Sequence, residues 1–348
     1  MGGSATQKMN KPITPARTFR NTPQSAGGGR HRAALVQKAH ASIRKGSKSF
    51  SAASRLFDRA TREKVWLLYA WCRRCDDIAD CQDHGGELRV EGCSSDTAQD
   101  RIDAIRILTR RALDGFPTAD VAFDAFGLVA QETGLTMEMA EDVIAGFDLD
   151  AEDWRPRNEG DLMRYCYHVA GAVGVMMAVV MGVDPEDEDT LDRACDLGLA
   201  FQLANIARDL TEDDAAGRCY LPVEWLVEED IEPGQHTKPH HRQELADMAE
   251  RLITRMDHHA AAARLGAARL PFRSRWAILS AARIYTAIGH EVRAKGTAAW
   301  DHRVYTSKAA KLRHVAAAFW EALVNKPAPP AKMPRWTRSQ LAERATGA

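Results

Sequence analysis

Two groups of oxygen-bearing side chains in this sequence are spaced to hold a metal ion. Asp76 and Asp80 occur in the segment DDIAD, and Asn205, Asp209 and Asp213 occur in the segment NIARDLTED. Side chains four residues apart project from nearly the same side of an α-helix, so each group can gather its oxygens in one place. Ligand sets made only of oxygen favour a hard cation such as Mg²⁺, with Mn²⁺ as an alternative, over zinc or copper. The spacing therefore predicts two facing groups of metal ligands.

Arginines beside these acids indicate what the metal site binds. Arg73 lies one turn before Asp76, and Arg208 directly precedes Asp209. A guanidinium group can bind two phosphate oxygens at once, and Mg²⁺ that bridges carboxylates to phosphate stabilises the charge on a departing diphosphate. The combination of acids and arginines predicts a diphosphate site.

Each acidic group taken alone has a simpler interpretation. Acids and arginines three or four residues apart also form weak ion pairs on a solvated helix face. The segments that precede them argue against this, because WLLYAWC (66–72) and LGLAFQLANIA (197–207) are strongly apolar and belong in a protein interior. Acids carried into an apolar interior need partners. We therefore expect both groups at one internal site.

The elements that position these residues are predicted to be helices. Apolar residues recur with helical spacing along most of the chain, whereas alternating β-branched runs bounded by hairpin turns do not occur. The predicted fold class is all-α, with a single domain, one helical bundle, over residues 33–325. The predicted helices cover residues 33–45, 61–82, 98–114, 118–132, 136–150, 158–182, 187–214, 238–265, 273–296 and 306–325.

The two ends of the chain differ from the predicted bundle. The chain has 348 residues and a formal net charge of −1, yet no acidic residue occurs before Asp58. Residues 1–32 are rich in Gly, Pro, Ser and Thr, and we expect a disordered basic tail there. Residues 326–348 are expected to form a Pro-rich basic tail. The N-terminal tail has two interpretations, attraction to an anionic lipid surface or a solubilising extension.

Apolar runs and cysteines indicate the compartment. The apolar run at 169–183 is interrupted by glycines and is too short to span a bilayer, so no transmembrane segment is expected. Seven cysteines scattered over helical segments favour a reducing compartment, the cytoplasm, over a disulfide framework. Cys72 and Cys75 lack a second pair and are not expected to bind zinc. His258 and His259 are expected on the solvated surface.

Five segments, in their order and spacing, resemble the squalene and phytoene synthase family. They are KGSKSF (45–50), LLYAWCRRCDDIAD (67–80), YCYHVAGAVG (165–174), LAFQLANIARDLTED (199–213) and GRCYLP (217–222). The resemblance covers nearly all of residues 33–325, and it is greatest to bacterial members that make phytoene. It implies an all-α prenyltransferase bundle with a central apolar cavity that joins two isoprenoid diphosphates head to head with Mg²⁺.

The resemblance also implies roles for individual residues. The implied metal ligands, of which the aspartates are also the catalytic residues, are Asp76, Asp80, Asn205, Asp209 and Asp213. The residues implied to bind the diphosphates or close the site are Ser47, Tyr69, Arg73, Arg208, Arg218, Tyr220, Tyr285, Arg293 and Arg303. The register around Arg303 is loose, so Lys308 or Lys311 could take its place. Ala204 is smaller than the residue expected there, which affects cavity shape and not metal binding.

The reaction implied is the Mg²⁺-dependent condensation of two geranylgeranyl diphosphates through prephytoene diphosphate to phytoene, the first committed step of carotenoid biosynthesis. NADPH is not expected, because no GxGxxG fingerprint follows a strand. Five apolar side chains could line the cavity or belong to the ordinary core. They are Phe50, Met176, Met177, Phe201 and Leu203.

Two alternatives stay open. A C30 synthase would make dehydrosqualene or squalene from farnesyl diphosphate with the same acidic groups. A non-catalytic relative would act as an assembly factor, although such members have lost the acidic motifs that are intact here. The expected partners are prenyl diphosphates and, peripherally, the inner face of a membrane; no nucleic acid is expected.

Overall fold

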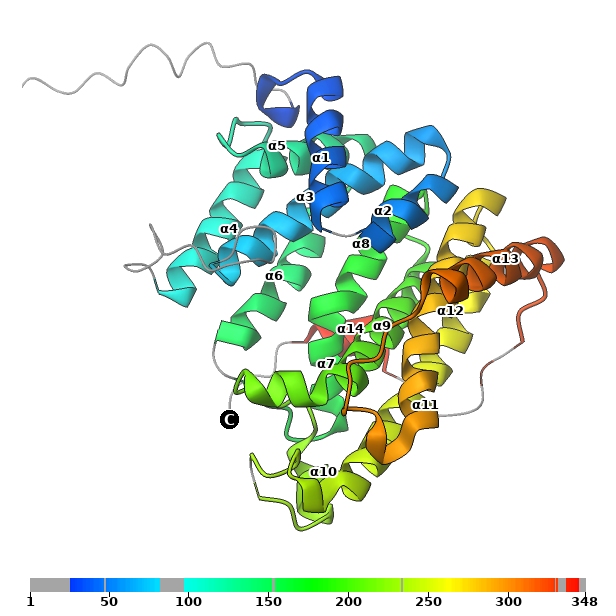
Figure 1. The fold of residues 1–348 in the computed structure, drawn as a ribbon. Coiled ribbons are helices and arrows are strands. Elements are labelled where there is room, and N and C mark those ends of the chain that lie inside the picture. The colour runs from blue at the N-terminus through cyan, green and yellow to red at the C-terminus, as the bar shows by residue number, and fades with distance from the viewer. Residues whose placement is uncertain are drawn as a thin grey trace, which may run out of the picture.

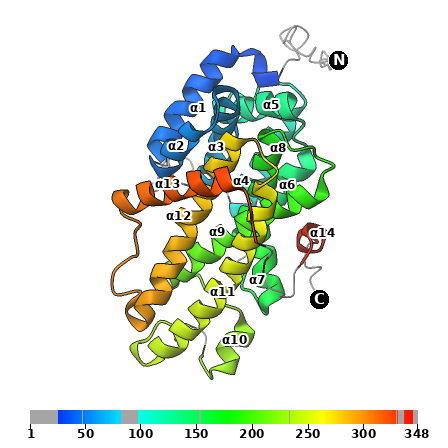
Figure 2. The same cartoon turned by 90° about the vertical axis from the view of Figure 1, so that its right-hand side faces the viewer.

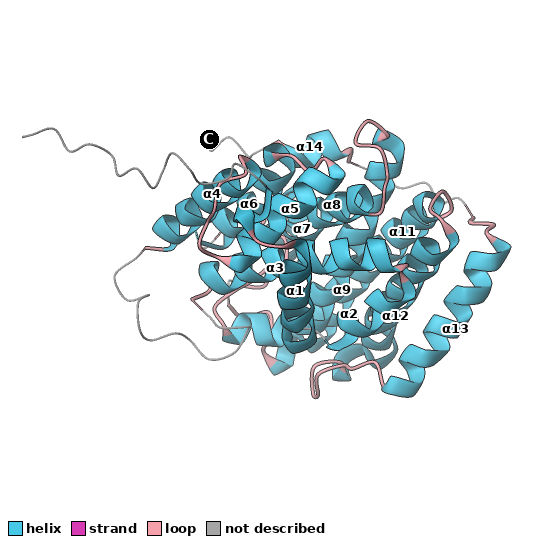
Figure 3. Ribbon diagram, turned by 90° about the horizontal axis from the view of Figure 1, so that it is seen from above, coloured by secondary structure: helices cyan, strands magenta, loops and turns pink. Residues whose placement is uncertain are grey.

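The structure is a computed structural model that describes residues 26–46, 48–81, 97–151, 154–232, 234–328, 330 and 336–343. Within these ranges every regular element is a helix and none is a strand (Figure 3), so the predicted all-α class is confirmed. The main helices are α1 (Arg32–Gly46), α2 (Lys48–Ala53), α3 (Arg59–Ala79), α4 (Ala98–Leu113), α5 (Val121–Thr133), α6 (Met137–Ala151), α7 (Glu159–Cys166), α8 (Ala172–Val180), α9 (Glu188–Ala215), α10 (Val223–Glu228), α11 (Arg242–Ala267), α12 (Phe272–Lys295), α13 (Lys308–Val324) and α14 (Arg338–Ala342).

Helices α8 and α9 run through the middle of the bundle. Figure 1 shows α1 and α3 to α6 on one side of them and α11 to α13 on the other. Helix α9 packs against α8, α11 and α12, whereas α3 packs against α1, α5 and α8. Both helices that carry acidic motifs therefore border α8.

Helices α7 and α8 form one continuous helical stretch through a π-helical turn at Tyr167–Gly171. Glycines on α8 and on α9 allow these two helices to approach closely. A β-carbon on Gly198 would lie 2.3 Å from the carbonyl oxygen of Ala170, and one on Gly174 would lie 2.5 Å from that of Ala194. Since neither backbone can move away cheaply, only glycine fits at these two positions.

One helical stretch in the described part of the chain, Glu159–Val180, is long and apolar enough to cross a membrane by length and composition. Of its most apolar window, 67% is buried inside the bundle. Core helices of large proteins have the same composition. The stretch therefore serves as a core element in this fold.

Three short helices, α2, α10 and α14, were not predicted from the sequence. Helix α10 follows Pro222 and buries Trp225. Helix α14 lies within the predicted Pro-rich tail, begins at a capping box formed by Thr337 and Gln340, and buries Leu341 against the bundle. Helices of five or six residues contain too few turns to produce a periodic pattern.

The N-terminal boundary of the bundle also differs from the expectation. Residues 26–32, which the sequence places in the disordered tail, are packed on α5: Gly27 is buried and Arg30 forms an ion pair with Asp124. Asp124 is fully buried and accepts hydrogen bonds from Thr118, so the arginine neutralises an interior carboxylate. Residues 1–25, and Ser47, lie outside the described residues.

Two expectations about single side chains are wrong. His258 and His259 are buried, not solvated, because α11 packs against both α9 and α12. His259 Nδ1 lies 2.7 Å from a carboxylate oxygen of Asp196, which also accepts from Arg193 at 2.7 Å. Cys81 is disulfide-bonded, which the scattered cysteines did not predict.

Candidate active site

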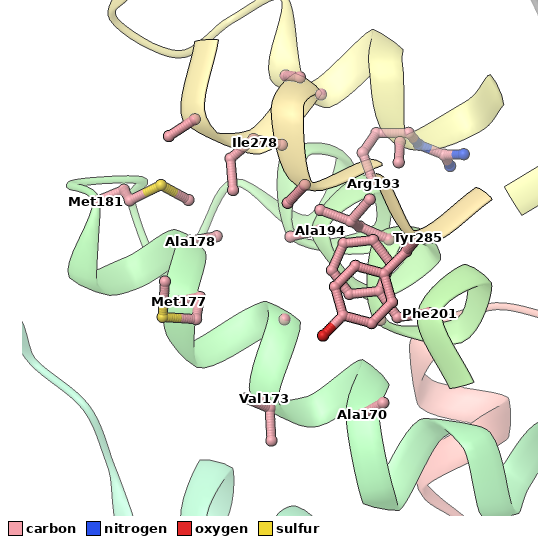
Figure 4. Close-up of a pocket in the computed structure, with 18 of the residues that line it drawn as sticks. Ala170, Val173, Met177, Ala178, Met181, Arg193, Ala194, Phe201, Ile278 and Tyr285 are labelled. Carbon is pink, nitrogen blue, oxygen red and sulfur yellow. The ribbon is translucent and has the colours of Figure 1, made fainter. Parts of the chain in front are cut away.

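An apolar cavity of about 340 Å³ lies between α8, α9 and α12. Figure 4 shows Val173, Met177 and Met181 of α8 along one wall, and Phe201 and Tyr285 on the facing one. The rings of Phe201 and Tyr285 are stacked, with centroids 4.1 Å apart. Small residues at the close α8–α9 approach line the cavity as well, so the glycines serve both packing and the cavity. They include Ala170, Gly174, Ala194 and Gly198.

The first acidic motif lies at the C-terminal end of α3. The Asp80 backbone N–H donates to the Asp76 carbonyl at 2.9 Å, so the helical geometry predicted for this pair extends through its second member. Asp77 points elsewhere: it is buried and accepts from the Arg73 guanidinium at 2.7 and 3.0 Å. The same guanidinium lies 3.9 Å from Asp76.

The Asp76 side chain is about half exposed, yet its surroundings disfavour its negative charge. Burial within the site raises the pKa of its carboxyl to about 7; Arg73 opposes the rise, while repulsion from Asp80 adds to it. A carboxylate in this condition is a group that a divalent cation would stabilise.

The second motif lies on α9, which runs from the cavity to the acids. Asn205 lines the cavity, and Asp209 and Asp213 follow it one and two turns further along the helix. Asp209 is held by two arginines, its neighbour Arg208 and Arg303, whose nearest nitrogen is 2.9 Å away. Burial and the charge of Asp209 raise the pKa of Asp213 to about 7.

Arg218 connects the two motifs. It lies in the loop after α9, and its guanidinium is 3.9 Å from a carboxylate oxygen of Asp80 at the end of α3. Its charge also lowers the pKa of Asp213, against the rise caused by burial. One cation therefore lies close to the first motif and within electrostatic reach of the second.

A further carboxylate, which the sequence did not single out, lines a small pocket together with Arg218. Asp150, on α6, accepts hydrogen bonds from the hydroxyls of Tyr165 at 3.1 Å and Tyr220 at 3.2 Å, and these two rings are stacked. Burial raises the pKa of Asp150, and Arg218 opposes the rise. Within DLDAED the sequence gives no sign that separates Asp150 from Asp148, which pairs with Arg106.

Gly46 and Phe50 lie against α3 in the turns that precede the first motif. A β-carbon on Gly46 would be 2.5 Å from the Tyr69 hydroxyl and 3.6 Å from a side-chain carbon of Arg73. Tyr69 also contacts the Phe50 ring, and burial raises the pKa of its phenol to about 12. A larger residue at position 46 would therefore displace the Tyr69 hydroxyl.

The arginines implied by resemblance fall into two environments. Arg303 donates to Asp209 of the second motif. Arg293 instead forms ion pairs with Glu250 and Asp257 on the surface between α11 and α12. The contacts of Arg293 join it to neither acidic motif.

The apolar candidates also divide into two sets. Phe50, Met177 and Phe201 line the cavity. Met176 and Leu203 are fully buried in the surrounding core and do not line it. Ala204 is likewise buried away from the cavity, so its small size does not set the shape of the wall.

The described residues contain no group of three or more His, Cys, Asp or Glu side chains that could hold a metal ion. The candidate donors nevertheless suit a hard cation: all of them are oxygen atoms, and Asp76 and Asp213 both have raised pKa values. Asp209 forms ion pairs with Arg208 and Arg303.

Comparison with known proteins gives consistent results. The profile of the family described as Squalene/phytoene synthase matches residues 43–310. A phytoene synthase of Pseudescherichia vulneris is 46% identical over 284 residues, which are 82% of this chain and 91% of the relative. A 15-cis-phytoene synthase of Pantoea ananas is 44% identical over 292 residues, 84% of this chain and 93% of the relative.

Solved structures agree at the level of the fold. A dehydrosqualene synthase in complex with a ligand has a TM-score of 0.73 at 24% identity, covering 84% of this chain and 98% of that one. A squalene synthase from Alicyclobacillus acidocaldarius has a TM-score of 0.66 at 22% identity, covering 78% of this chain and 98% of that one. The family resemblance of the five segments is thus confirmed, and the chain belongs to the squalene/phytoene synthase family.

Proposed function

We propose that this protein is a phytoene synthase, a prenyltransferase that condenses two geranylgeranyl diphosphates head to head through prephytoene diphosphate to phytoene, with release of diphosphate. It would catalyse the first committed step of carotenoid biosynthesis. Identities of 44% to 46% to phytoene synthases over more than 80% of the chain support this assignment. One structural arrangement carries it. Arg218 lies 3.9 Å from Asp80 of the first motif and lowers the pKa of Asp213 in the second, and Asn205 of the second motif lines the apolar cavity.

Diphosphate binding is assigned to the arginines around the acids. Arg73, Arg218 and Arg303 bring guanidinium groups to the edge of the two motifs. Planar guanidinium groups bind phosphate oxygens in pairs and hold the leaving group in place. Mg²⁺, when bound by Asp76 and Asp80 on one side and by Asn205, Asp209 and Asp213 on the other, would neutralise the departing diphosphate.

The cavity supplies the environment for the carbon chemistry. Loss of diphosphate leaves an allylic cation, which the alkene of the second molecule attacks; loss of a proton then closes the cyclopropyl ring of prephytoene diphosphate. A second loss of diphosphate, rearrangement and proton loss then give phytoene. Walls such as Met177 and the stacked Phe201 and Tyr285 exclude water that would quench the cation. Ring faces also favour a nearby positive charge.

The C30 alternative differs from this proposal in the length of the prenyl substrate. The test is incubation of the purified protein with Mg²⁺ and either farnesyl or geranylgeranyl diphosphate, without NADPH, followed by identification of the hydrocarbon. We expect phytoene from the C20 substrate. Dehydrosqualene from the C15 substrate alone would establish the C30 alternative, and no diphosphate release from either would favour a non-catalytic member.

A further inference from the structure

Helix α13 exposes an apolar face that no described part of the chain covers. Its members, which we call the α13 face, are Leu312, Ala316, Phe319, Trp320, Leu323 and Val324. Trp320 is 65% exposed and Leu312 71%, values that are unusual for side chains of this size. The spacing of 312, 316, 320 and 323 is that of one side of an α-helix. At the C-terminal end Phe319 contacts the ring of Phe272, which continues the apolar surface onto α12.

The opposite face of α13 is fixed to the bundle by specific contacts. Trp276 of α12 donates to the Val315 carbonyl at 2.9 Å, and Ala318 is fully buried. Glu321 accepts from Arg264 at 2.9 Å and from Arg283 at 2.6 Å. These contacts orient the helix, so the outward direction of the α13 face is a built feature of the fold.

The charges on α13 are distributed unequally between its two sides. Glu321 is the only acidic residue of the helix, and both of its ion pairs lie on the inner side. Lys308 and Arg313 are exposed beside the α13 face, and Lys326 follows the helix. An apolar face whose exposed charged neighbours on its own helix are cations, with a tryptophan on it, is typical of helices that lie in the surface of an anionic bilayer.

We propose that the α13 face docks the protein on an anionic lipid surface, with Trp320 and Leu323 in the headgroup region and Lys308 and Arg313 against lipid phosphates. Figures 1 and 3 show α13 at the edge of the molecule, where a flat surface can reach it. A second copy of the chain is disfavoured as the occupant. A symmetric dimer would bring the same cations of both copies towards each other.

The position of α13 relative to the cavity gives this docking a consequence. Helix α13 lies on α12 (Figure 2), and Ile278 of α12 both packs against the buried Ala318 and Ala322 cluster and lines the cavity. A lipid surface on α13 therefore lies one helix away from the cavity. If the proposed function holds, this shortens the path of an insoluble product to the bilayer.

The test is flotation of the full-length protein with vesicles that contain phosphatidylglycerol and phosphatidylcholine, compared with phosphatidylcholine alone. The variant is Trp320→Ser with Leu323→Ser. Its matched control is Ile107→Ser with Val227→Ser, which removes two apolar side chains that are 65% and 70% exposed on α4 and α10. We expect the α13 variant to lower the bound-to-free ratio by about tenfold or more and the control to leave it within about twofold.

The charge component is tested separately. Lys308→Gln with Arg313→Gln should weaken binding to the anionic vesicles and reduce its dependence on salt. Equal binding of the α13 variant and the wild type would overturn the proposal. The proposal would also be overturned if neither protein bound any vesicle and the wild type were a dimer that the α13 variant converts to a monomer. No substrate is involved, so the outcome is independent of the proposed activity.

Discussion

The guanidinium of Arg218, in the loop that follows the second acidic motif, lies 3.9 Å from a carboxylate oxygen of Asp80 in the first motif. Arg218→Gln should lower kcat/KM for the prenyl diphosphate by about 10²- to 10³-fold, because a charge that stabilises the leaving group is lost. Arg218→Lys should restore part of the loss. Arg251→Gln, which removes an exposed surface arginine paired with Glu228, serves as the control and should be unaffected.

Arg303 and Arg293 are expected to differ, because only Arg303 contacts an acidic motif. Arg303→Gln should reduce turnover by about tenfold or more, whereas Arg293→Gln should stay within about twofold of the wild type. Steady-state kinetics with geranylgeranyl diphosphate measure both. An equal loss in Arg293→Gln would place that residue in the site after all.

The metal-free protein should become less stable as the pH rises. The pKa of Asp213 is raised to about 7 from an ordinary value of 3.8, so between these values the folded form keeps a proton that the unfolded form has lost. Stability therefore falls with rising pH through this window and stays low above it. Thermal unfolding in EDTA from pH 4 to pH 8 should show this fall, in part removed by Asp213→Asn. A melting temperature that rises across the window would contradict the burial of this charge.

The same carboxylates should make Mg²⁺ binding depend on pH. Asp76 and Asp213 must lose their protons before they bind a cation, and both have pKa values of about 7. At subsaturating Mg²⁺, activity should fall as the pH drops from about 8 to about 6, and added Mg²⁺ should restore it. A fall that no Mg²⁺ concentration corrects would point to a different titrating group.

The close approach of α8 and α9 can be tested through stability. Gly198→Ala places a β-carbon 2.3 Å from a backbone oxygen, so it should lower the free energy of unfolding by about 2 to 4 kcal/mol. Gly160→Ala is the matched control, because its β-carbon would meet two side-chain atoms and no backbone, Asn158 Oδ1 at 3.2 Å and Trp336 Nε1 at 3.8 Å. Urea unfolding compares the two. Equal stability of both variants would mean that α8 and α9 are less closely packed than described.

The sequence was sufficient for the long helices and for both acidic motifs, because their signals are local. A period of 3.6 residues over twenty or more positions, as in α9 or α11, leaves little choice of structure. The spacing of Asp76 and Asp80 likewise fixes their geometry as soon as the segment is helical.

The remaining features depend on which elements pack together, which local patterns do not encode. Asp150 joins the site because α6 brings it to Tyr165 and Tyr220. His259 is buried because α11 packs on α9, where Asp196 lies opposite it. Met176 and Met177 are adjacent in the sequence and have identical side chains, yet of the two only Met177 lines the cavity.

The most direct test is phytoene formation from geranylgeranyl diphosphate with Mg²⁺ and no NADPH by the wild type, Asp80→Ala and Asp209→Ala. Asp189→Ala serves as a control, because it removes an exposed acid at the far end of α9. If the two motifs act on one diphosphate site, each motif variant should lose about 10³-fold or more of the wild-type rate while the control keeps it. Full activity of either motif variant, with the fold intact, would contradict the account.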